Sequence, residues 1–103
     1  MSLLARDANG NTIQAIKQGR VQNLDYTGTP AVSAAFGSET TIIQATAKTD
    51  SYYLVGVNPV VTTDNGTFHP GKVTYFIPVS PGQQIAYIQD TTGGRANITE
   101  GKV

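Results

Sequence analysis

Cysteine and tryptophan are absent from this chain, and His69 is its one histidine. Without cysteine there can be no disulfide, thiolate nucleophile or cysteine-ligated zinc, so the folded state must depend on apolar packing or on partners. No apolar run approaches the roughly 18 residues that a membrane-spanning helix needs. The N-terminus also lacks a basic segment followed by a long apolar stretch. We therefore expect neither a membrane partner nor a secretion signal.

Charge is scarce as well. Charged residues make up 14% of the chain, and seven basic residues balance seven acidic ones. Soluble domains average roughly 25% charged residues. No segment concentrates positive charge, so nucleic-acid binding by counterion release has no electrostatic basis. Because a domain with few charges and no net charge resists self-association poorly, the composition favours a protein that is packed against others.

The chain consists mainly of short segments with strand character. Runs rich in Val, Ile, Thr and Tyr alternate with Gly, Pro, Asn and Asp. The predicted strands are residues 20–26, 31–36, 40–48, 52–57, 73–77, 84–89 and 95–100. Pro30 and Gly37 leave residues 31–36 too short for a stable helix. About seven or eight short strands in 103 residues predict an all-β fold: one antiparallel β-sandwich or jelly-roll-like domain.

The first residues are predicted to form an N-terminal arm or hairpin. Asn9-Gly10 suits a tight turn with positive φ, and residues 12–17 have the pattern of a short return strand. Ile13 and Ile16, three residues apart, are equally compatible with a helical turn. We assign residues 1–11 to the arm or hairpin and residues 12–103 to the β-sandwich domain.

Residues 72–100 are interpreted as the scaffold of the fold. The predicted strands 73–77 and 84–89 flank a Pro- and Gly-rich turn at 78–82, which predicts a core hairpin. A second hairpin turn is expected at residues 90–94. It leads into a half-buried edge strand in which Ala96 and Ile98 alternate with polar residues.

The longest irregular stretch, residues 58–70, is the first candidate for a contact surface, because long loops in small domains are usually functional. Asp64 and His69 lack the further ligands that a metal site would need. Asp64-Asn65-Gly66 lacks the later acidic ligand of an EF-hand loop. A β-turn with Gly66 at positive φ explains it better.

Two further patterns have both a functional and a structural interpretation. Residues 92–95 could cradle a phosphate, but the helix and the Lys-Ser/Thr pair of a P-loop are missing. Aromatic residues could form a sugar-binding platform, although aromatics at strand spacing more often pack in a core. They are Tyr26, Tyr52, Tyr53, Tyr75, Tyr87, Phe36, Phe68 and Phe76. With no motif for catalysis, metal or cofactor, we expect a non-enzymatic protein that needs no cofactor and no small-molecule substrate.

Several segments taken together resemble a known class of proteins. They are residues 4–11 (LARDANGN) with Gln14, 51–59 (SYYLVGVNP), 66–71 (GTFHPG), 81–86 (PGQQIA), 92–94 (TGG) and 98–100 (ITE). In this order they resemble small β-rich virion proteins of tailed bacteriophages, a class that includes capsid decoration, or cement, proteins.

The resemblance implies a β-sandwich or jelly-roll domain that binds the outer surface of an icosahedral capsid as a dimer or trimer. There it would brace the major capsid protein, after passing through the host cytoplasm during assembly. The residues expected to make the contacts are Leu3, Leu4, Arg6, Val60, Val61, Phe68 and His69. The alternatives are a tail or head-tail junction component, or a carbohydrate-binding adhesive domain displayed on the virion.

Overall fold

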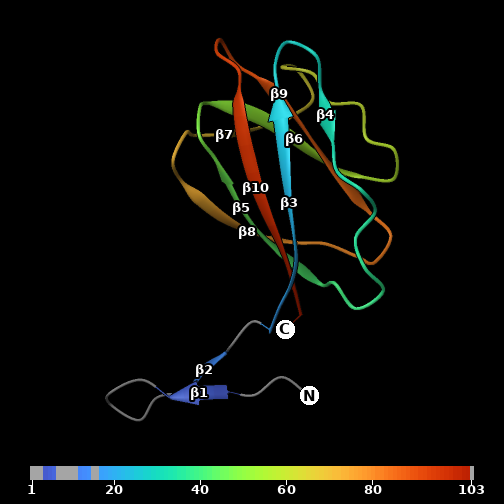
Figure 1. Cartoon of the computed structure of the whole chain (residues 1–103), viewed down its shortest axis with the longest axis vertical. Coiled ribbons are helices and arrows are strands. Elements are labelled where there is room, and N and C mark those ends of the chain that lie inside the picture. The colour runs from blue at the N-terminus through green and yellow to red at the C-terminus, as the bar shows by residue number, and fades with distance from the viewer. Residues whose placement is uncertain (1–3, 7–11, 15–16, 103) are drawn as a thin grey trace.

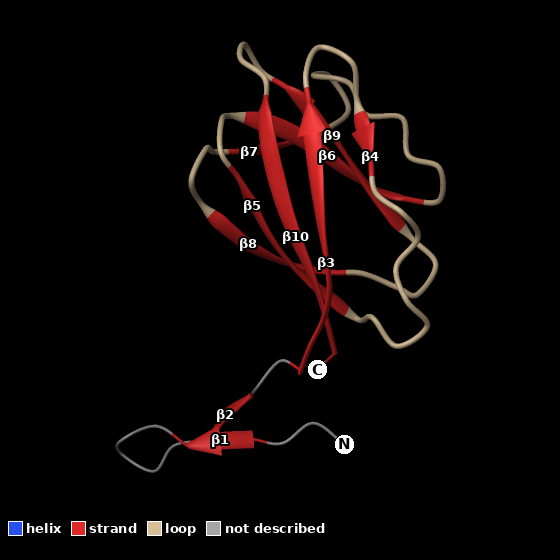
Figure 2. Ribbon diagram, viewed as in Figure 1, coloured by secondary structure: helices blue, strands red, loops and turns tan. Residues whose placement is uncertain are grey.

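The computed structural model describes residues 4–6, 12–14 and 17–102, and every regular element in these residues is a β-strand. Two four-stranded antiparallel sheets face each other as the layers of a sandwich (Figures 1 and 2). Their strands are β3 (Lys17–Tyr26), β4 (Ala31–Val32), β5 (Ile42–Ala47), β6 (Ser51–Gly56), β7 (Thr67–His69), β8 (Thr74–Pro78), β9 (Gln84–Gln89) and β10 (Gly94–Lys102). The predicted all-β sandwich is confirmed. The described part of the chain contains no helix with the length and apolarity needed to cross a membrane.

The strand order is that of a jelly roll. One sheet has the order β3-β10-β5-β8 and the other β4-β9-β6-β7. The first strand of the sandwich therefore pairs with its last, and the pairs β4 with β9, β5 with β8 and β6 with β7 nest inside. From β3 to β10, only the β6–β7 connection stays within one sheet. Two nested Greek keys of this kind define the jelly-roll arrangement.

The predicted core hairpin is wrong. Strands β8 and β9 form where expected, but β8 pairs with β5 in one sheet and β9 pairs with β4 and β6 in the other. The segment at residues 90–94 likewise crosses between the sheets and is not a hairpin turn. Strand β10 lies between β3 and β5, so it is a central strand and not an edge. Pro and Gly mark where the chain reverses, but distant strands decide which sheet it enters.

The N-terminal residues form a separate ladder. Strand β1 (Leu4–Arg6) pairs antiparallel with β2 (Thr12–Gln14), and Figure 1 shows the pair outside the two sheets. Because β2 pairs with β1 and the sandwich begins with β3 at Lys17, the boundary predicted at Thr12 falls inside this ladder. The predicted Asn9-Gly10 turn lies outside the described residues.

The core lies between the two sheets. In β3, Leu24 and Tyr26 point inward while Val21, Asn23 and Asp25 are exposed, because successive side chains of a strand face opposite sides of the sheet. The buried cluster consists of Leu24, Tyr26, Phe36, Ile43, Ala45, Ala47, Ile85, Tyr87, Ala96 and Ile98. It draws on both sheets, so burying this cluster requires the sheets to pack face to face.

A buried carboxylate fastens the β4–β5 connection to the β3-β10-β5-β8 sheet. Glu100 on β10 accepts hydrogen bonds at Oε2 from Arg20 Nε (2.6 Å) and Gln22 Nε2 (3.2 Å). At Oε1 it accepts from the Gly37 N–H and the Thr40 hydroxyl, both at 2.8 Å. Burial alone would raise the pKa of Glu100. The donated hydrogen bonds outweigh burial and hold the pKa below its ordinary value.

The same side chains cover the free edge of β3. Arg20 donates to the carbonyl of Ala35 at 2.7 Å, and Gln22 Oε1 accepts the Ala34 N–H at 2.9 Å. Ala34 and Ala35 are thereby held beside Arg20 and Gln22, so this part of the β3 edge is not open to another strand.

We expect Glu100→Gln to lower the free energy of unfolding by about 2–4 kcal/mol near neutral pH, since charged hydrogen bonds to a buried group are lost. The lowered pKa means that the ionised group stabilises the fold above about pH 4.5, and this contribution is lost as the pH falls through the folded-state pKa. The variant should therefore show a weaker loss of stability in acid. Urea unfolding at neutral and acid pH measures both effects.

The matched control is Glu39→Gln, because Glu39 is exposed and lies 3.5 Å from Lys102. It should change stability by no more than about 0.5 kcal/mol. Equal effects of the two substitutions would contradict the role assigned to Glu100.

Candidate functional site

The β6–β7 loop, residues 57–66, is held by hydrogen bonds of its own. The Thr62 hydroxyl accepts the N–H groups of Asp64 and Asn65, each at 3.2 Å. Asn65 Oδ1 accepts the Thr62 N–H at 2.6 Å, and Asn65 Nδ2 donates to the carbonyl of Val60 at 2.8 Å. The side chains of Thr62 and Asn65 therefore bond to the backbone of the loop, which holds residues 60–65 in defined positions.

Gly66 is needed for space and not for a positive φ. In the part of the chain that the structure describes, the residues with positive φ are Asn58, Lys72 and Gly82, so the β-turn predicted with Gly66 in that conformation is wrong. A Cβ at Gly66 would lie 2.8 Å from both Tyr52 Cβ and Val61 Cγ2. The loop thus packs closely against β6 at this point.

Four residues between Val60 and His69 were predicted from the sequence to contact a partner, and two of them are exposed while two are buried. Val60 and Phe68 are 72% and 42% exposed, whereas Val61 is 1% exposed and His69 is fully buried. Val61 packs beside Tyr52, outside the cluster between the sheets. Buried side chains offer no surface to a partner, so Val61 and His69 support the loop from within. Val57, which the sequence did not single out, is 73% exposed.

The side chains of the three N-terminal residues predicted to make contacts lie outside what the structure describes. Leu3 lies outside the described residues. Leu4 and Arg6 belong to β1, of which the backbone pairing with β2 is described. Their role in partner contact stays a prediction.

His69 joins β7, β8 and β9. Nε2 donates to the carbonyl of Val73 at 2.6 Å, because a carbonyl can only accept, and Nδ1 then accepts from the Tyr87 hydroxyl at 3.0 Å. The imidazole stacks on Tyr75 with 4.3 Å between ring centroids. Burial lowers the pKa of His69, although the hydrogen bond to Val73 acts in the opposite direction. With both ring nitrogens bonded, His69 is a structural residue and forms no metal pair with Asp64.

The tyrosines considered for a sugar platform mostly lie in the core. Tyr26 stacks on Tyr87 at 5.8 Å, and Tyr53 packs edge-on against His69 and Tyr75. Burial raises the pKa of Tyr87. Tyr52 lies on the outer side of its sheet, where it packs edge-on against Phe68 at 5.4 Å. The aromatic set therefore serves mainly to fill the space between the sheets.

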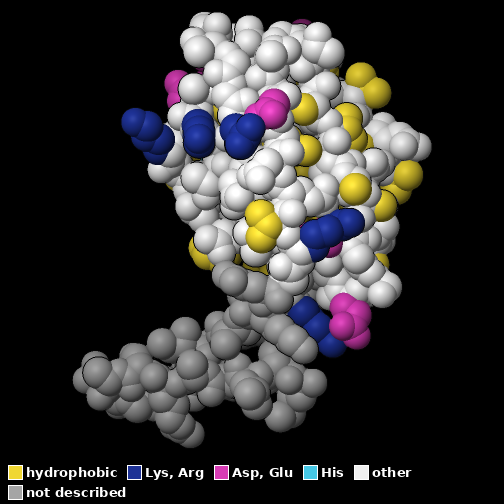
Figure 3. Space-filling view, in the orientation of Figure 1, with side chains coloured by type: hydrophobic (Ala, Val, Ile, Leu, Met, Phe, Trp, Pro, Cys, Tyr) yellow, Lys and Arg dark blue, Asp and Glu magenta, His cyan; other side chains and the backbone are white. Residues whose placement is uncertain are grey.

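The outer face of the β3-β10-β5-β8 sheet is polar and has little charge. The register aligns Asn23, Asn97, Thr46 and Thr74 in one row across the sheet. Asn97 Nδ2 donates to Asn23 Oδ1 at 3.0 Å, and the hydroxyls of Thr46 and Thr74 are 2.8 Å apart. Figure 3 shows this face as mostly neutral surface, with a row of basic side chains near one end. The four side chains of this row therefore already have hydrogen-bond partners on neighbouring strands.

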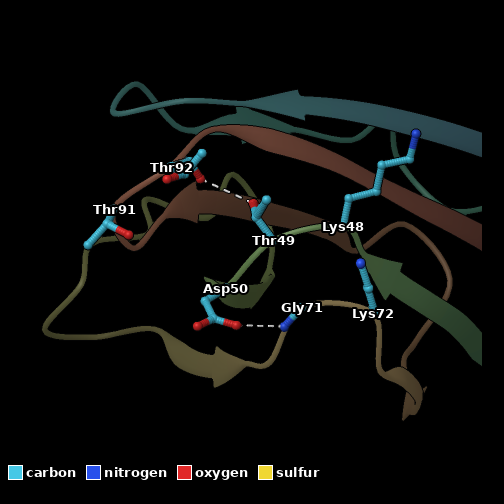
Figure 4. Close-up of a pocket in the computed structure, with 7 residues that line it drawn as sticks. All are labelled: Lys48, Thr49, Asp50, Gly71, Lys72, Thr91 and Thr92. Atoms are coloured by element: carbon cyan, nitrogen blue, oxygen red, sulfur yellow. Dashed lines mark hydrogen bonds between the residues drawn. The ribbon is translucent and has the colours of Figure 1, made fainter.

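A shallow hollow of about 340 Å³ lies where three connections meet (Figure 4). It is lined by Lys48, Thr49, Asp50, Gly71, Lys72, Thr91 and Thr92. Asp50 Oδ1 accepts the Gly71 N–H at 2.8 Å, and the Thr49 hydroxyl donates to the carbonyl of Thr92 at 3.1 Å. These bonds hold the three connections together. Among the described residues, no group of three or more acidic or histidine side chains could hold a metal ion.

Residues 92–95, considered from the sequence as a phosphate cradle, have structural roles. Arg95 pairs with Asp25 at 2.7 Å. A Cβ at Gly94 would overlap the Thr49 hydroxyl and lie 2.8 Å from the Tyr26 hydroxyl. The glycine therefore allows close packing between the end of β3 and the β5–β6 connection.

Replacement of Gly66 by Ala should lower the free energy of unfolding by about 1–3 kcal/mol, since Tyr52 or Val61 must move to admit the methyl group. Gly56→Ala is the matched control, because a Cβ at Gly56 meets nothing within 4 Å. Its effect should stay within about 1 kcal/mol. Urea unfolding measures the free energy of unfolding of both variants. Equal destabilisation by the two substitutions would contradict the close packing of the loop against β6.

The fold should lose stability as the pH falls below about 6.5, because the lowered pKa of His69 means that the unfolded chain takes up a proton before the folded one does. The contribution is fully present above that pH. His69→Phe should be less stable at neutral pH, since it leaves Tyr87 and Val73 without their partner, and should lack this pH dependence. NMR titration of the imidazole gives the pKa directly. An ordinary or raised pKa in the folded chain would contradict the buried neutral tautomer.

The exposed part of the β6–β7 loop together with Phe68 is thus the candidate contact surface, and we name the set Val57, Val60 and Phe68 the apolar contact residues. No protein-family model, curated protein or solved structure matches this chain at a significant level.

Proposed function

We propose that this protein is a non-enzymatic structural component of a bacteriophage virion that binds the outer surface of the capsid and stabilises it. The observation that carries the proposal is the exposure of the apolar contact residues: Val57 and Val60 lie on a loop that its own hydrogen bonds hold in place, and Phe68 lies on the adjoining β7. The resemblance of the chain to small β-rich virion proteins supplies the partner, namely the major capsid protein.

Exposed apolar side chains on an ordered loop suit a protein partner. Val57 and Val60 remain more than two-thirds exposed, although the neighbouring Val61 shows that this loop can bury a valine. Fully burying one such side chain stabilises a contact by about 1.5–3 kcal/mol. Because the loop is already ordered, little conformational entropy is lost on binding.

The charge distribution favours the outside of a capsid over its interior. A surface that faces packaged nucleic acid is expected to be basic, whereas this chain has no net charge and a largely neutral outer face on one sheet (Figure 3). A jelly roll is also a fold that viral capsid domains use. These points support a place on the outer capsid surface over one near the genome.

Stabilisation of the capsid follows from mass action. A protein that binds assembled subunits and not free ones shifts the equilibrium toward the assembled particle. Many copies, each with a modest contact, together oppose disassembly, and dimers or trimers that bridge subunits gain from effective concentration. A tail or head-tail junction component could use the same contact residues, but it would be confined to a few positions on the particle.

Val60→Asp and Phe68→Asp should each weaken binding to purified heads, assembled from the capsid protein encoded in the same genome, by at least about tenfold, since a buried unpaired charge costs more than 1.4 kcal/mol. Val21→Asp is the matched control, because Val21 is an exposed valine on the far sheet. Co-sedimentation with heads measures the binding. Deletion of residues 1–11 tests the arm in the same assay.

Unchanged binding by Val60→Asp and Phe68→Asp would contradict the proposal that the apolar contact residues bind the capsid. Unchanged occupancy after deletion of residues 1–11, with unchanged thermal stability of the particles, would exclude the arm. Failure of the wild-type chain to bind heads would overturn the proposed function itself.

A further inference from the structure

Of the four edge strands in the two sheets of the sandwich, three are short or partly covered. An uncovered edge strand presents unpaired N–H and C=O groups to other chains, and proteins commonly shorten or cover such edges. Strands β4 and β7 have two and three residues. On the edge of β3, the side chains of Arg20 and Gln22 bond to Ala35 and Ala34, so that segment covers the edge at this point.

Strand β8 differs from these three edges. It has five residues, and within the described residues it pairs with β5 alone. Figure 1 shows it as the outermost strand of its sheet. Residues 73–78 contain no charged side chain, and Phe76 is 57% exposed. An edge that is long, uncharged and partly apolar is a site for pairing with another strand.

The register shows which backbone groups of β8 are free. The Val79 N–H donates to the carbonyl of Thr41 at 3.1 Å, which continues the β8–β5 register by one residue. In an antiparallel ladder, hydrogen-bonded pairs alternate with non-bonded ones. The N–H and C=O groups of Tyr75 and Ile77 therefore face β5, and those of Thr74 and Phe76 face outward.

Pro78 also belongs to the outward-facing set. Its nitrogen has no hydrogen to donate, which is tolerated on the open side of an edge strand. Its carbonyl remains free to accept. The open edge thus offers donors at Thr74 and Phe76 and acceptors at Thr74, Phe76 and Pro78.

We propose that β8 pairs antiparallel with β8 of a second copy about a two-fold axis at Phe76, which joins two four-stranded sheets into one of eight strands. In this register Phe76 exchanges two hydrogen bonds with Phe76 of the second copy. Each Thr74 N–H donates to the Pro78 carbonyl of the second copy. The edge is therefore complementary to itself, as an isologous interface requires.

The side chains and charges of the edge agree with this arrangement. The two Phe76 rings lie on the same face of the joined sheet as a direct cross-strand pair, which is a stabilising combination. Lys72 precedes β8, so antiparallel pairing places the two Lys72 residues at opposite ends, roughly 27 Å apart along the strand direction. Charges at that separation are largely screened by salt.

This inference supplies an interface for the oligomer in the proposed function, but it concerns the isolated chain and requires no capsid. Light scattering of the purified full chain over a range of concentrations measures its mass. The wild type should approach twice its 10.9 kDa monomer mass as concentration rises. Phe76→Lys should remain a monomer, because it places two charges side by side at the axis. Val21→Lys, an equal change on the covered edge of the same sheet, should dimerise like the wild type.

Amide hydrogen exchange gives a second measurement that does not depend on a variant. The amides of Thr74 and Phe76 should exchange more slowly as concentration rises, whereas those of Tyr75 and Ile77 should be protected at every concentration. Circular dichroism checks that Phe76→Lys is folded, and if it is not, the exchange data alone decide.

Three results would overturn the pairing: a wild-type chain that stays monomeric, dimers of Phe76→Lys as stable as those of the wild type, or Thr74 and Phe76 amides that exchange equally fast at all concentrations. A monomeric chain that still binds heads would overturn this inference and leave the proposed function standing. A dimer that does not bind heads would support this inference and overturn the proposed function.

Discussion

The contacts of His69 are the interaction on which this sandwich most depends. The imidazole on β7 bonds to Tyr87 on β9 and to the carbonyl of Val73, and it stacks on Tyr75 of β8, so one side chain fastens both sheets together. These contacts require a neutral ring with its hydrogen on Nε2. They also explain how a chain without cysteine or tryptophan fills the space between two sheets, since Tyr26, Tyr53, Tyr75 and Tyr87 pack around this point.

Much of the fold could be predicted from the sequence, but its connectivity could not. Runs rich in Val, Ile, Thr and Tyr predicted most of the strands, and the Gly and Pro clusters predicted where strands end. The pairing of the strands could not be predicted, because it depends on segments that are distant in the sequence. Strand β8, for example, lies beside β5 and not beside β9, its neighbour in the chain. The three residues of β7 were missed inside an irregular stretch, since so short a run has no detectable period.

The candidate surface was predictable as a segment and not residue by residue. The length of the irregular stretch indicated residues 58–70. The sequence does not indicate, however, that Val60 is exposed and Val61 is buried, because the two neighbours are identical. That difference arises where the loop packs against β6 at Tyr52 and Gly66. Likewise, a lone histidine before a proline gives no sign of its partners, because Tyr87 follows 18 residues later. In both cases the deciding contact is made by another strand.

The hydrogen bonds of Glu100, His69 and Asn65 join segments of the fold to one another, while large apolar side chains stay exposed, among them Val57 and Val60 on the β6–β7 loop and Phe76 on β8. Such an arrangement fits a protein that works by covering other proteins. The proposed place on the capsid can be tested by quantitative mass spectrometry of purified virions from the same genome. We expect on the order of hundreds of copies per particle, in fixed proportion to the major capsid protein, as binding across a symmetric shell requires. Absence from the particle, or only a few copies, would contradict it.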